Sequence, residues 1–437
     1  MKSIKLYILF LLIPALTVAQ TFTLEQSIET GLKNSKELKI SQAKVIGSDA
    51  KITEVSSQML PRLSLAASYT RFSSVPAFEI QTPIFPQPIK IQDAILNNYS
   101  VKLSLQQPLF TGFRLSSLKS AADYNYQAEE LQYDGDVNKY ALTIQIAFWN
   151  FYKDKEHLKL ANENLQLIQK HLDETKEFFN NELVTKNDVL KMEVQSSNAE
   201  LNLVDAKNNL DLARINFNKT IGIDLNSSSD IEIPDISSDK NDYDPDQLLE
   251  EAKQKRNELK SAEYRLKAST EGVTAATSNW FPNVYLFGDV YYNRPNQRYQ
   301  PLEDKFNDSW DAGVSLSWDL WNWGYNSSQT TQAEQLKVQT ESNLELLNDA
   351  VEVEVYRTYL NYSKAYDRIM ISKQTVEQAD ENYRTTKEKY EAQIATSTDL
   401  IDAEVSLLQA KTNLTNALAD FQVTKIQLEK AVGRRIY

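Results

Sequence analysis

The sequence predicts a mainly α-helical protein that also contributes four strands to a membrane β-barrel. Three observations support this fold class. The two halves of the 437-residue chain repeat each other, long segments carry an apolar residue at every seventh position, and shorter segments alternate apolar with polar residues. Glycine and proline are scarce, with 10 and 12 residues respectively, which is typical of long helices.

Residues 1–19 have the features of a secretory signal peptide. Lys2 and Lys5 form a basic start, an apolar run begins at Leu6, and the segment ends in the small residue Ala19. The apolar run is too short for a membrane-spanning helix. We therefore expect cleavage after Ala19, and a buried core segment is the alternative.

The rest of the chain is an internal duplication. Residues 179–222 align with residues 390–433 without a gap and with eleven identical residues, among them Thr185 with Thr396. We therefore expect two structural repeats, joined by a linker rich in serine, aspartate and asparagine. The expected bounds are 20–222 for the first repeat, 223–244 for an equatorial linker, 245–433 for the second repeat and 434–437 for a C-terminal tail.

Each repeat should contain one very long helix followed by a shorter one. A seven-residue apolar period indicates helices that supercoil with their neighbours, whereas an ordinary helix buried on one face is the alternative. The period runs through Ile144, Phe151, Leu158, Leu165, Leu172 and Phe179, and again through Val355, Tyr362, Ile369, Val376, Tyr383 and Tyr390. The expected helices are 24–59, 113–181, 187–221, 245–279, 324–392 and 398–432. Each of the two longest spans roughly 100 Å at 1.5 Å per residue.

Four segments between the helices have the two-residue period of β-strands. The expected strands lie near 61–73, 98–110, 282–293 and 309–321, and each is about as long as a tilted membrane strand requires. Tryptophans gather at the ends of the strands, as in the aromatic girdles of outer-membrane barrels. A soluble sandwich with buried aromatic residues is the alternative. The loops at 75–98 and 293–308 are expected to face outside the cell.

Four strands cannot close a barrel, and open sheet edges are not tolerated in lipid. Several copies of the chain must therefore share one barrel. Two copies would supply eight strands and three would supply twelve, and both numbers are physically allowed. The attached helices must then close around the same axis, so that a coiled-coil cylinder continues the β-barrel.

The residues that usually carry catalysis or bind metals are missing or dispersed. The chain has no cysteine, and its two histidines, His157 and His171, lie fourteen residues apart on one helix, where we expect both at the surface. No phosphate-binding loop, nucleophile elbow or dinucleotide fingerprint is present. We therefore expect neither an enzyme nor a cofactor. The formal net charge of −13 argues against nucleic acid as a partner.

Three stretches are more specific than the pattern alone. They are QPLFTGFR at 107–114, its counterpart WDLWNWGYN at 318–326, and YEAQIATSTDLIDAEV at 390–405. Together with the duplication and the order of elements, they make the mature chain resemble the outer-membrane efflux protein family, the TolC-like channel-tunnels. The resemblance implies a bacterial outer-membrane homotrimer with a twelve-stranded barrel and an α-barrel tunnel that crosses the periplasm. It implies an exit duct for drug efflux or type I secretion, docked to a periplasmic adaptor (membrane-fusion) protein and an inner-membrane transporter.

In such a duct the two turns at 182–187 and 393–398 would form the periplasmic tips. Threonine and aspartate suit these turns, because their side chains satisfy the free N–H groups of the following helix. The expected adaptor contacts are Glu182, Leu183, Val184, Thr185, Gln393, Ile394, Ala395 and Thr396. This chain departs from the family where Glu182 and Gln393 replace the usual tip glycines and Ala395 replaces an arginine.

Two aspartates follow the second turn on one face of the next helix, because Asp399 and Asp402 are three residues apart. The resemblance assigns the D-x-x-D-A motif at 399–403 to the closed entrance of the tunnel. Three copies would place six carboxylates around the pore, and such rings select cations. Helix capping plus a solvated face is the alternative, although capping does not account for Asp402.

The resemblance also implies a latch that keeps the entrance shut. Tyr390 matches a family tyrosine that bonds a neighbouring aspartate, and Asp188 matches that aspartate, with Asn187 beside it. A different function class stays open at this stage, namely a periplasmic coiled-coil scaffold that never enters the membrane. Such a scaffold would have no need of alternating strands with clustered tryptophan.

Overall fold

The computed structural model describes residues 20–74, 76–233 and 239–437, so the expected signal peptide at 1–19 lies outside the described residues. The chain divides into two compact units. The first, which we call the hairpin unit, comprises residues up to 42 together with 133–257 and 348–437. The second, which we call the sheet unit, comprises residues 43–132 and 258–347.

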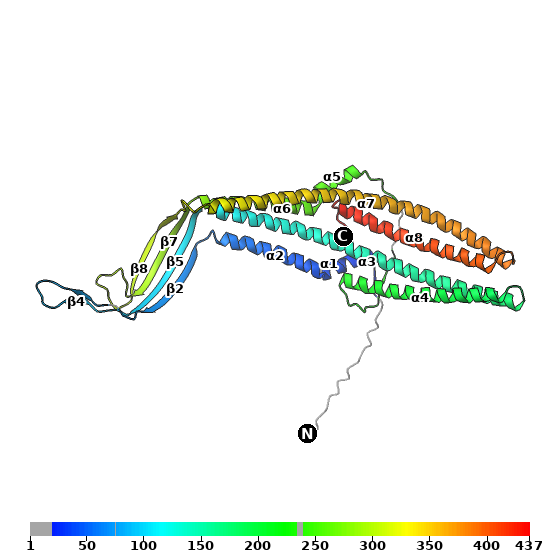
Figure 1. Cartoon of the computed structure of the whole chain (residues 1–437), viewed down its shortest axis with the longest axis horizontal. Helices are drawn as coiled ribbons and strands as arrows, with labels where there is room; N and C mark the ends of the chain where they lie inside the picture. The colour runs from blue at the N-terminus through cyan, green and yellow to red at the C-terminus, as the bar shows by residue number, and fades with distance from the viewer. Residues whose placement is uncertain (1–19, 75, 234–238) are drawn as a thin grey trace, which may run out of the picture. The chain divides into compact units, whose positions relative to one another are not determined.

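Two antiparallel helix hairpins dominate the hairpin unit (Figure 1). In the first, α3 (Arg114–Asn180) is followed by α4 (Lys186–Ile221), and in the second, α7 (Tyr325–Glu391) is followed by α8 (Ser397–Ala431). The helix α4 contacts α8. Smaller elements complete the unit: the helices α1 (Leu24–Asn34) and α5 (Pro245–Lys255), and the parallel strand pair β1 (Gln20–Phe22) and β6 (Ser229–Ile231). Neither β1 nor β6 was expected from the sequence.

Two of the expected helices are wrong in one respect, because each is interrupted. The segment 24–59 breaks at Ser35 into α1 and α2 (Lys36–Ser57), where the Ser35 hydroxyl accepts a hydrogen bond from Leu38 N at 3.1 Å. The segment 245–279 breaks at Arg256 into α5 and α6 (Asn257–Thr277). The Arg256 backbone is extended (φ −66°, ψ 122°), and its side chain is held by a distant glutamate described below.

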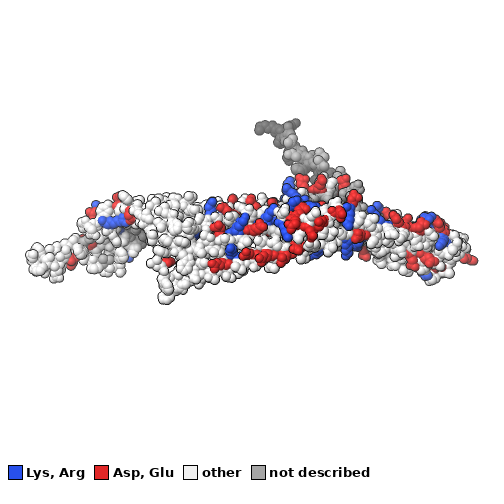
Figure 2. All heavy atoms as spheres, turned by 90° about the horizontal axis from the view of Figure 1, so that it is seen from above, with Lys and Arg blue, Asp and Glu red and all other residues white. Residues whose placement is uncertain are grey.

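The core of the hairpin unit is aromatic. Ile144, Phe148 and Phe151 of α3 pack against Phe217 and Ile221 of α4, and all five side chains are buried. In the second hairpin Tyr362 of α7 stacks on Phe421 of α8, with ring centroids 5.3 Å apart. Positions of the seven-residue apolar period thus lie inside both hairpins. On the face that Figure 2 shows, acidic and basic side chains are intermingled over the helices.

The sheet unit contains one four-stranded antiparallel sheet in the order β2-β5-β7-β8 (Figure 1). These strands are β2 (Arg62–Arg71), β5 (Asn97–Thr111), β7 (Asn283–Arg294) and β8 (Asn307–Ser317). The strand β8 therefore ends four residues before the expected 321. The loop expected at 75–98 holds a further hairpin of β3 (Phe78–Ile80) and β4 (Ile89–Gln92). Among the described residues, no helix combines the length and the apolar character needed to cross a membrane.

The two faces of the sheet differ in chemistry. One row across all four strands pairs Leu65, Leu103, Val290 and Trp310, and all four side chains are exposed, Leu65 at 71% and Trp310 at 73%. On the opposite face Lys102 and Asp289 form an ion pair at 2.8 Å. This alternation of an exposed apolar face with a polar face is the pattern of a strand between lipid and water.

A glycine reverses the chain between sheet and long helix. Gly112, in the QPLFTGFR stretch, has φ +61°, and a Cβ there would lie 2.5 Å from the Ser278 carbonyl oxygen. The counterpart Gly324 has φ +85°. Both positions need the left-handed backbone conformation that glycine adopts without strain. The repeated stretches therefore mark the turn from strand to helix in each half.

Candidate functional site at the hairpin tips

Both hairpin tips turn through a left-handed residue. Glu182 has φ +61° and Gln393 has φ +60°, which explains why a glycine suits these positions in the family that the sequence resembles. The chain then closes each turn by a backbone bond, from Leu183 N to Phe178 O at 2.9 Å and from Ile394 N to Lys389 O at 2.8 Å. A residue with a Cβ in this conformation costs roughly 1–2 kcal/mol.

Gln393→Gly is therefore expected to stabilise the second hairpin by up to about 1 kcal/mol, because part of the relieved strain is offset by the entropy of glycine. Thermal unfolding followed by circular dichroism measures the change. Lys389→Gly is the matched control. Lys389 lies within the helix α7, so its replacement by glycine should destabilise the protein by about 1 kcal/mol. A lower unfolding temperature for Gln393→Gly than for the parent protein would contradict the strain argument.

Each tip is followed by a reciprocal helix cap. Thr396 N donates to Asp399 Oδ2 at 2.8 Å, and Asp399 N donates to Thr396 Oγ1 at 3.2 Å. Thr185 and Asp188 form the same capping box at the start of α4. The hydrogen bonds from Thr396 hold the pKa of Asp399 below its ordinary value, and those from Thr185 do the same for the pKa of Asp188. Capping accounts for both of these carboxylates.

Asp402 is different, because its exposed carboxylate takes part in no hydrogen bond or ion pair within the described part of the chain. Capping therefore does not explain why an acid stands there. The matching position of the first repeat is Lys191, whose Nζ donates to Thr398 Oγ1 at 3.0 Å. The sequence reasoning missed this lysine, although the alignment of the two repeats was enough to find it.

The members of the expected latch are not brought together within one chain. Tyr390 is buried, and its hydroxyl lies 2.8 Å from Thr175 Oγ1. Thr175 donates its own hydrogen to the His171 carbonyl at 2.7 Å, so Tyr390 is the donor to Thr175. Asp188 is engaged by Thr185, and Asn187 is exposed. The latch between Tyr390 and Asp188 stays a prediction.

The surface location expected for His171 is wrong. Its side chain is fully buried between the hairpins, with Nδ1 2.9 Å from Glu174 Oε2 and Nε2 2.9 Å from Glu404 Oε1. The Tyr383 hydroxyl lies 3.3 Å from the same Nε2. The sequence around His171 gives no sign of burial, because its main partner, Glu404, lies in the other repeat. The available signal was that Ile168, His171 and Thr175 share one helix face.

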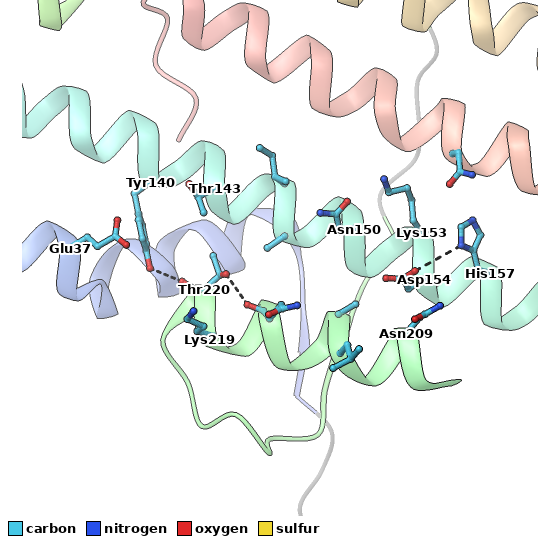
Figure 3. A pocket seen from close by; sticks show the side chains of 16 residues that line it. Glu37, Tyr140, Thr143, Asn150, Lys153, Asp154, His157, Asn209, Lys219 and Thr220 are labelled. Carbon is cyan, nitrogen blue, oxygen red and sulfur yellow. Dashed lines mark hydrogen bonds and ion pairs between the residues drawn. The ribbon is translucent and has the colours of Figure 1, made fainter. Parts of the chain in front are cut away.

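His157 is half-buried and lines a groove of about 770 Å³ between α3 and α4 (Figure 3). The Tyr140 hydroxyl donates to the Thr220 carbonyl at 2.9 Å on one side of the groove, and His157 Nδ1 lies 3.9 Å from Asp154 Oδ1 on the other. Across the described residues, no three His, Cys, Asp or Glu side chains are placed to hold a metal ion.

Comparisons with known proteins agree on one family. The family described as outer membrane efflux protein matches residues 28–222 and 248–434. The outer membrane protein TolC of Escherichia coli K12 is 24% identical over 428 residues, which cover 95% of this chain and 83% of the relative. The probable efflux pump outer membrane protein TtgC of Pseudomonas putida is 21% identical over 94% of this chain and 82% of its own.

Solved structures agree with this result at the level of the fold. The outer membrane protein VceC of Vibrio cholerae superposes with a TM-score of 0.80 and 20% identity, over 95% of this chain and 97% of its own. CusC superposes with a TM-score of 0.81 and 17% identity, over 96% and 98%. These values cover both the helix hairpins and the four-stranded sheet.

Proposed function

The chain belongs to the outer membrane efflux protein family, and from that premise we propose that it is the exit duct of a tripartite efflux pump or a type I secretion system. It is an outer-membrane efflux channel, with the fold of its structural neighbours. The observation that supports a duct inserted in the outer membrane is the exposed apolar row from Leu65 to Trp310 across the sheet. Such a row suits contact with outer-membrane lipid.

The sheet supports a shared barrel. Within the described residues β2 and β8 are its edge strands, and open edges are not tolerated in lipid. The helices also leave apolar residues exposed at seven-residue spacing, which suits packing against other copies. These residues are Val194 and Leu201 on α4, and Leu346, Val353 and Leu360 on α7. We favour the homotrimer, in which three sheets make a twelve-stranded barrel.

The hairpin tips are the proposed docking points for a periplasmic adaptor. Leu183 and Ile394 are exposed apolar residues at the two tips, Ile394 at 78%, and burial of such side chains against a partner would favour docking there. The relative TtgC is named as a component of an efflux pump. An inner-membrane transporter would then supply the energy, and this chain would act as a passive conduit.

The acidic pair Asp399 and Asp402 is the proposed entrance ring. Both side chains are exposed near the start of α8, and a homotrimer would bring six such carboxylates to one opening. A ring of carboxylates attracts cations and repels anions. The free carboxylate of Asp402 supports this role more strongly than that of Asp399, which already caps its helix.

Ion conductance of the purified protein in a planar lipid bilayer tests the proposed function. We expect discrete channels, and we expect the protein to sediment with the outer membrane and to need detergent for release. A protein that stays in solution after lysis without detergent, and forms no channels, would instead be the periplasmic scaffold.

Tyr390→Phe tests the proposed latch in the same bilayer. Loss of one buried hydrogen bond costs about 1 kcal/mol, so the resting conductance should rise by about fivefold. Thr175→Val and Asp188→Asn separate the two candidate partners of the tyrosine hydroxyl. If only Asp188→Asn reproduces the rise, the latch forms with Asp188 as the sequence predicts, and if only Thr175→Val does, the bond seen here holds the entrance. An unchanged resting conductance in Tyr390→Phe would show that neither closes the pore.

A further inference from the structure

A buried ion pair joins the two hairpins near their tips. His171 of α3 faces Glu404 of α8, with Nε2 and Oε1 2.9 Å apart, and neither side chain is more than about 1% exposed to solvent. Glu404 lies on the same helix as the proposed entrance ring, two residues after Asp402. Any movement of α8 away from α3 would separate this pair and shift the ring as well.

The groups around His171 come from three helices. Glu174 of α3 lies on Nδ1, while Glu404 of α8 and the Tyr383 hydroxyl of α7 lie on Nε2. Glu174 is also 3.8 Å from Lys170 Nζ on its other side. The fourth helix, α4, borders the neighbouring apolar core through Met192 and Ala199. The imidazole of His171 therefore has a carboxylate on each of its two ring nitrogens.

Glu404 depends on His171 for its charge balance. Among the described residues its two oxygens have no hydrogen-bond partner, so the ion pair with His171 is what compensates the charge of this buried carboxylate. An uncompensated buried carboxylate costs several kcal/mol. Burial raises the pKa of the Tyr383 phenol to about 12, with a further contribution from Glu404, so Tyr383 remains a neutral neighbour.

We propose that His171 and Glu404 form a proton-binding clamp that holds the two hairpins together when the imidazole is protonated and releases them when it is not. The inference rests on the proposed function, because it assigns a regulator to the entrance of the same duct. Its ligand is the proton alone. The clamp is built from a charge pair across the hairpin interface, and it is separate from the hydrogen bond between Tyr390 and Thr175.

The direction of the pH response follows from the surroundings. Burial alone would lower the pKa of His171, but the carboxylates of Glu404 and Glu174 outweigh it and hold that pKa above its ordinary value of 6.5. A group whose pKa is raised in the packed state stabilises that state below its ordinary pKa and loses the effect as the pH rises through the raised value. Each unit of difference in pKa corresponds to about tenfold in the equilibrium between packed and separated hairpins.

Exchange of the imidazole Cε1 hydrogen with deuterium, followed by mass spectrometry, tests the proton site directly. The chain has only two histidines, so His157 serves as an internal reference. The midpoint of the exchange profile for His171 should lie above 6.5, and Glu404→Gln should move it downward by about one unit or more without moving that of His157. A His171 midpoint at or below the ordinary value, or one that Glu404→Gln leaves in place, would overturn the proposal.

Bilayer conductance between pH 6 and pH 9, a range that begins near the ordinary histidine pKa of about 6.5 and extends above it, tests the consequence for the duct. Channel opening should increase several-fold towards alkaline pH in the parent protein, and His171→Gln should flatten the profile. His157→Gln is the matched control and should behave as the parent does. Channels whose pH profile is the same in His171→Gln would overturn the clamp while leaving the duct intact. If no variant forms channels the duct proposal fails, and the exchange experiment still decides whether the proton site exists.

Discussion

Replacing Arg256 with alanine is expected to lower the free energy of unfolding by about 1.5–3 kcal/mol, because it removes a buried arginine together with its charge-assisted hydrogen bond to the half-buried carboxylate of Glu354. Arg256 is 4% exposed, and its Nη1 lies 2.5 Å from Glu354 Oε2 on α7. Lys430 of α8 approaches the other oxygen of Glu354 at 3.3 Å. The side chain thus joins the break between α5 and α6 to the second hairpin.

The acid dependence of stability gives a second measure of the same contact. Burial opposes the ionised form of Glu354, but Arg256 and Lys430 outweigh it, so the pKa of Glu354 lies below its ordinary value of 4.5. The pairing therefore stabilises the fold above pH 4.5 and loses its effect as the pH falls through the lowered pKa. Arg256→Ala should reduce this loss at acid pH.

Thermal unfolding of Arg256→Ala beside Arg265→Ala measures the difference. Arg265 makes a more exposed pair with Glu129 at 3.3 Å, and such pairs contribute at most about 1 kcal/mol. The double variant Arg256→Met with Glu354→Gln should recover part of the stability, because it fills the space of the buried arginine with an apolar side chain and removes the charge that had paired with it. Equal losses for the two arginines would contradict the role of burial.

Asp402→Asn is expected to have the largest effect on ion selectivity. A charge about 4 Å from a passing ion is worth roughly 1 kcal/mol in water, so the ratio of cation to anion permeability should fall by about fivefold. The fold should keep its stability, because the Asp402 carboxylate takes part in no hydrogen bond or ion pair within the described residues. Reversal potentials across a salt gradient in the planar bilayer provide the ratio.

Asp399→Asn and Asp205→Asn complete the comparison. Asp399 also caps α8, so its replacement should reduce selectivity and in addition cost about 1 kcal/mol of stability. Asp205 is an exposed acid on α4, away from the tip, and its replacement should change neither quantity. If Asp402→Asn leaves the permeability ratio unchanged, the entrance ring does not set ion selectivity. Helix capping and a solvated helix face would then account for the two aspartates.

Local patterns predicted the long helices well. The spacing of Thr185 and Asp188, and of Thr396 and Asp399, is the signature of a capping box, and the structure has both boxes. The alternation of Leu63 to Tyr69 likewise predicted the strand β2. In each case the deciding interactions lie within a few residues along the chain, where a sequence pattern can record them.

Distant contacts decided the features that the sequence did not reveal. The break at Arg256 depends on Glu354, 98 residues further along, and an arginine in a helical pattern gives no sign of it. The burial of His171 depends on Glu404 in the other repeat. The Tyr390 hydroxyl meets Thr175, 215 residues away in the sequence, and no local pattern marks that contact. In the proposed homotrimer, closure of the barrel would depend on contacts between copies, which a single chain does not contain.

Lys191 and Asp402 occupy equivalent positions in the two aligned repeats, and their opposite charges show how far the duplicated halves have diverged. The halves still share their caps, but one copy now carries a cation at the position where the other carries an anion. In a homotrimer, six hairpins of similar shape would therefore alternate in charge around the opening. The approximate sixfold symmetry of the backbone would be reduced to a true threefold symmetry in its electrostatics. A partner that binds there by charge would meet two chemically distinct sites in alternation, and neither half of the chain could substitute for the other.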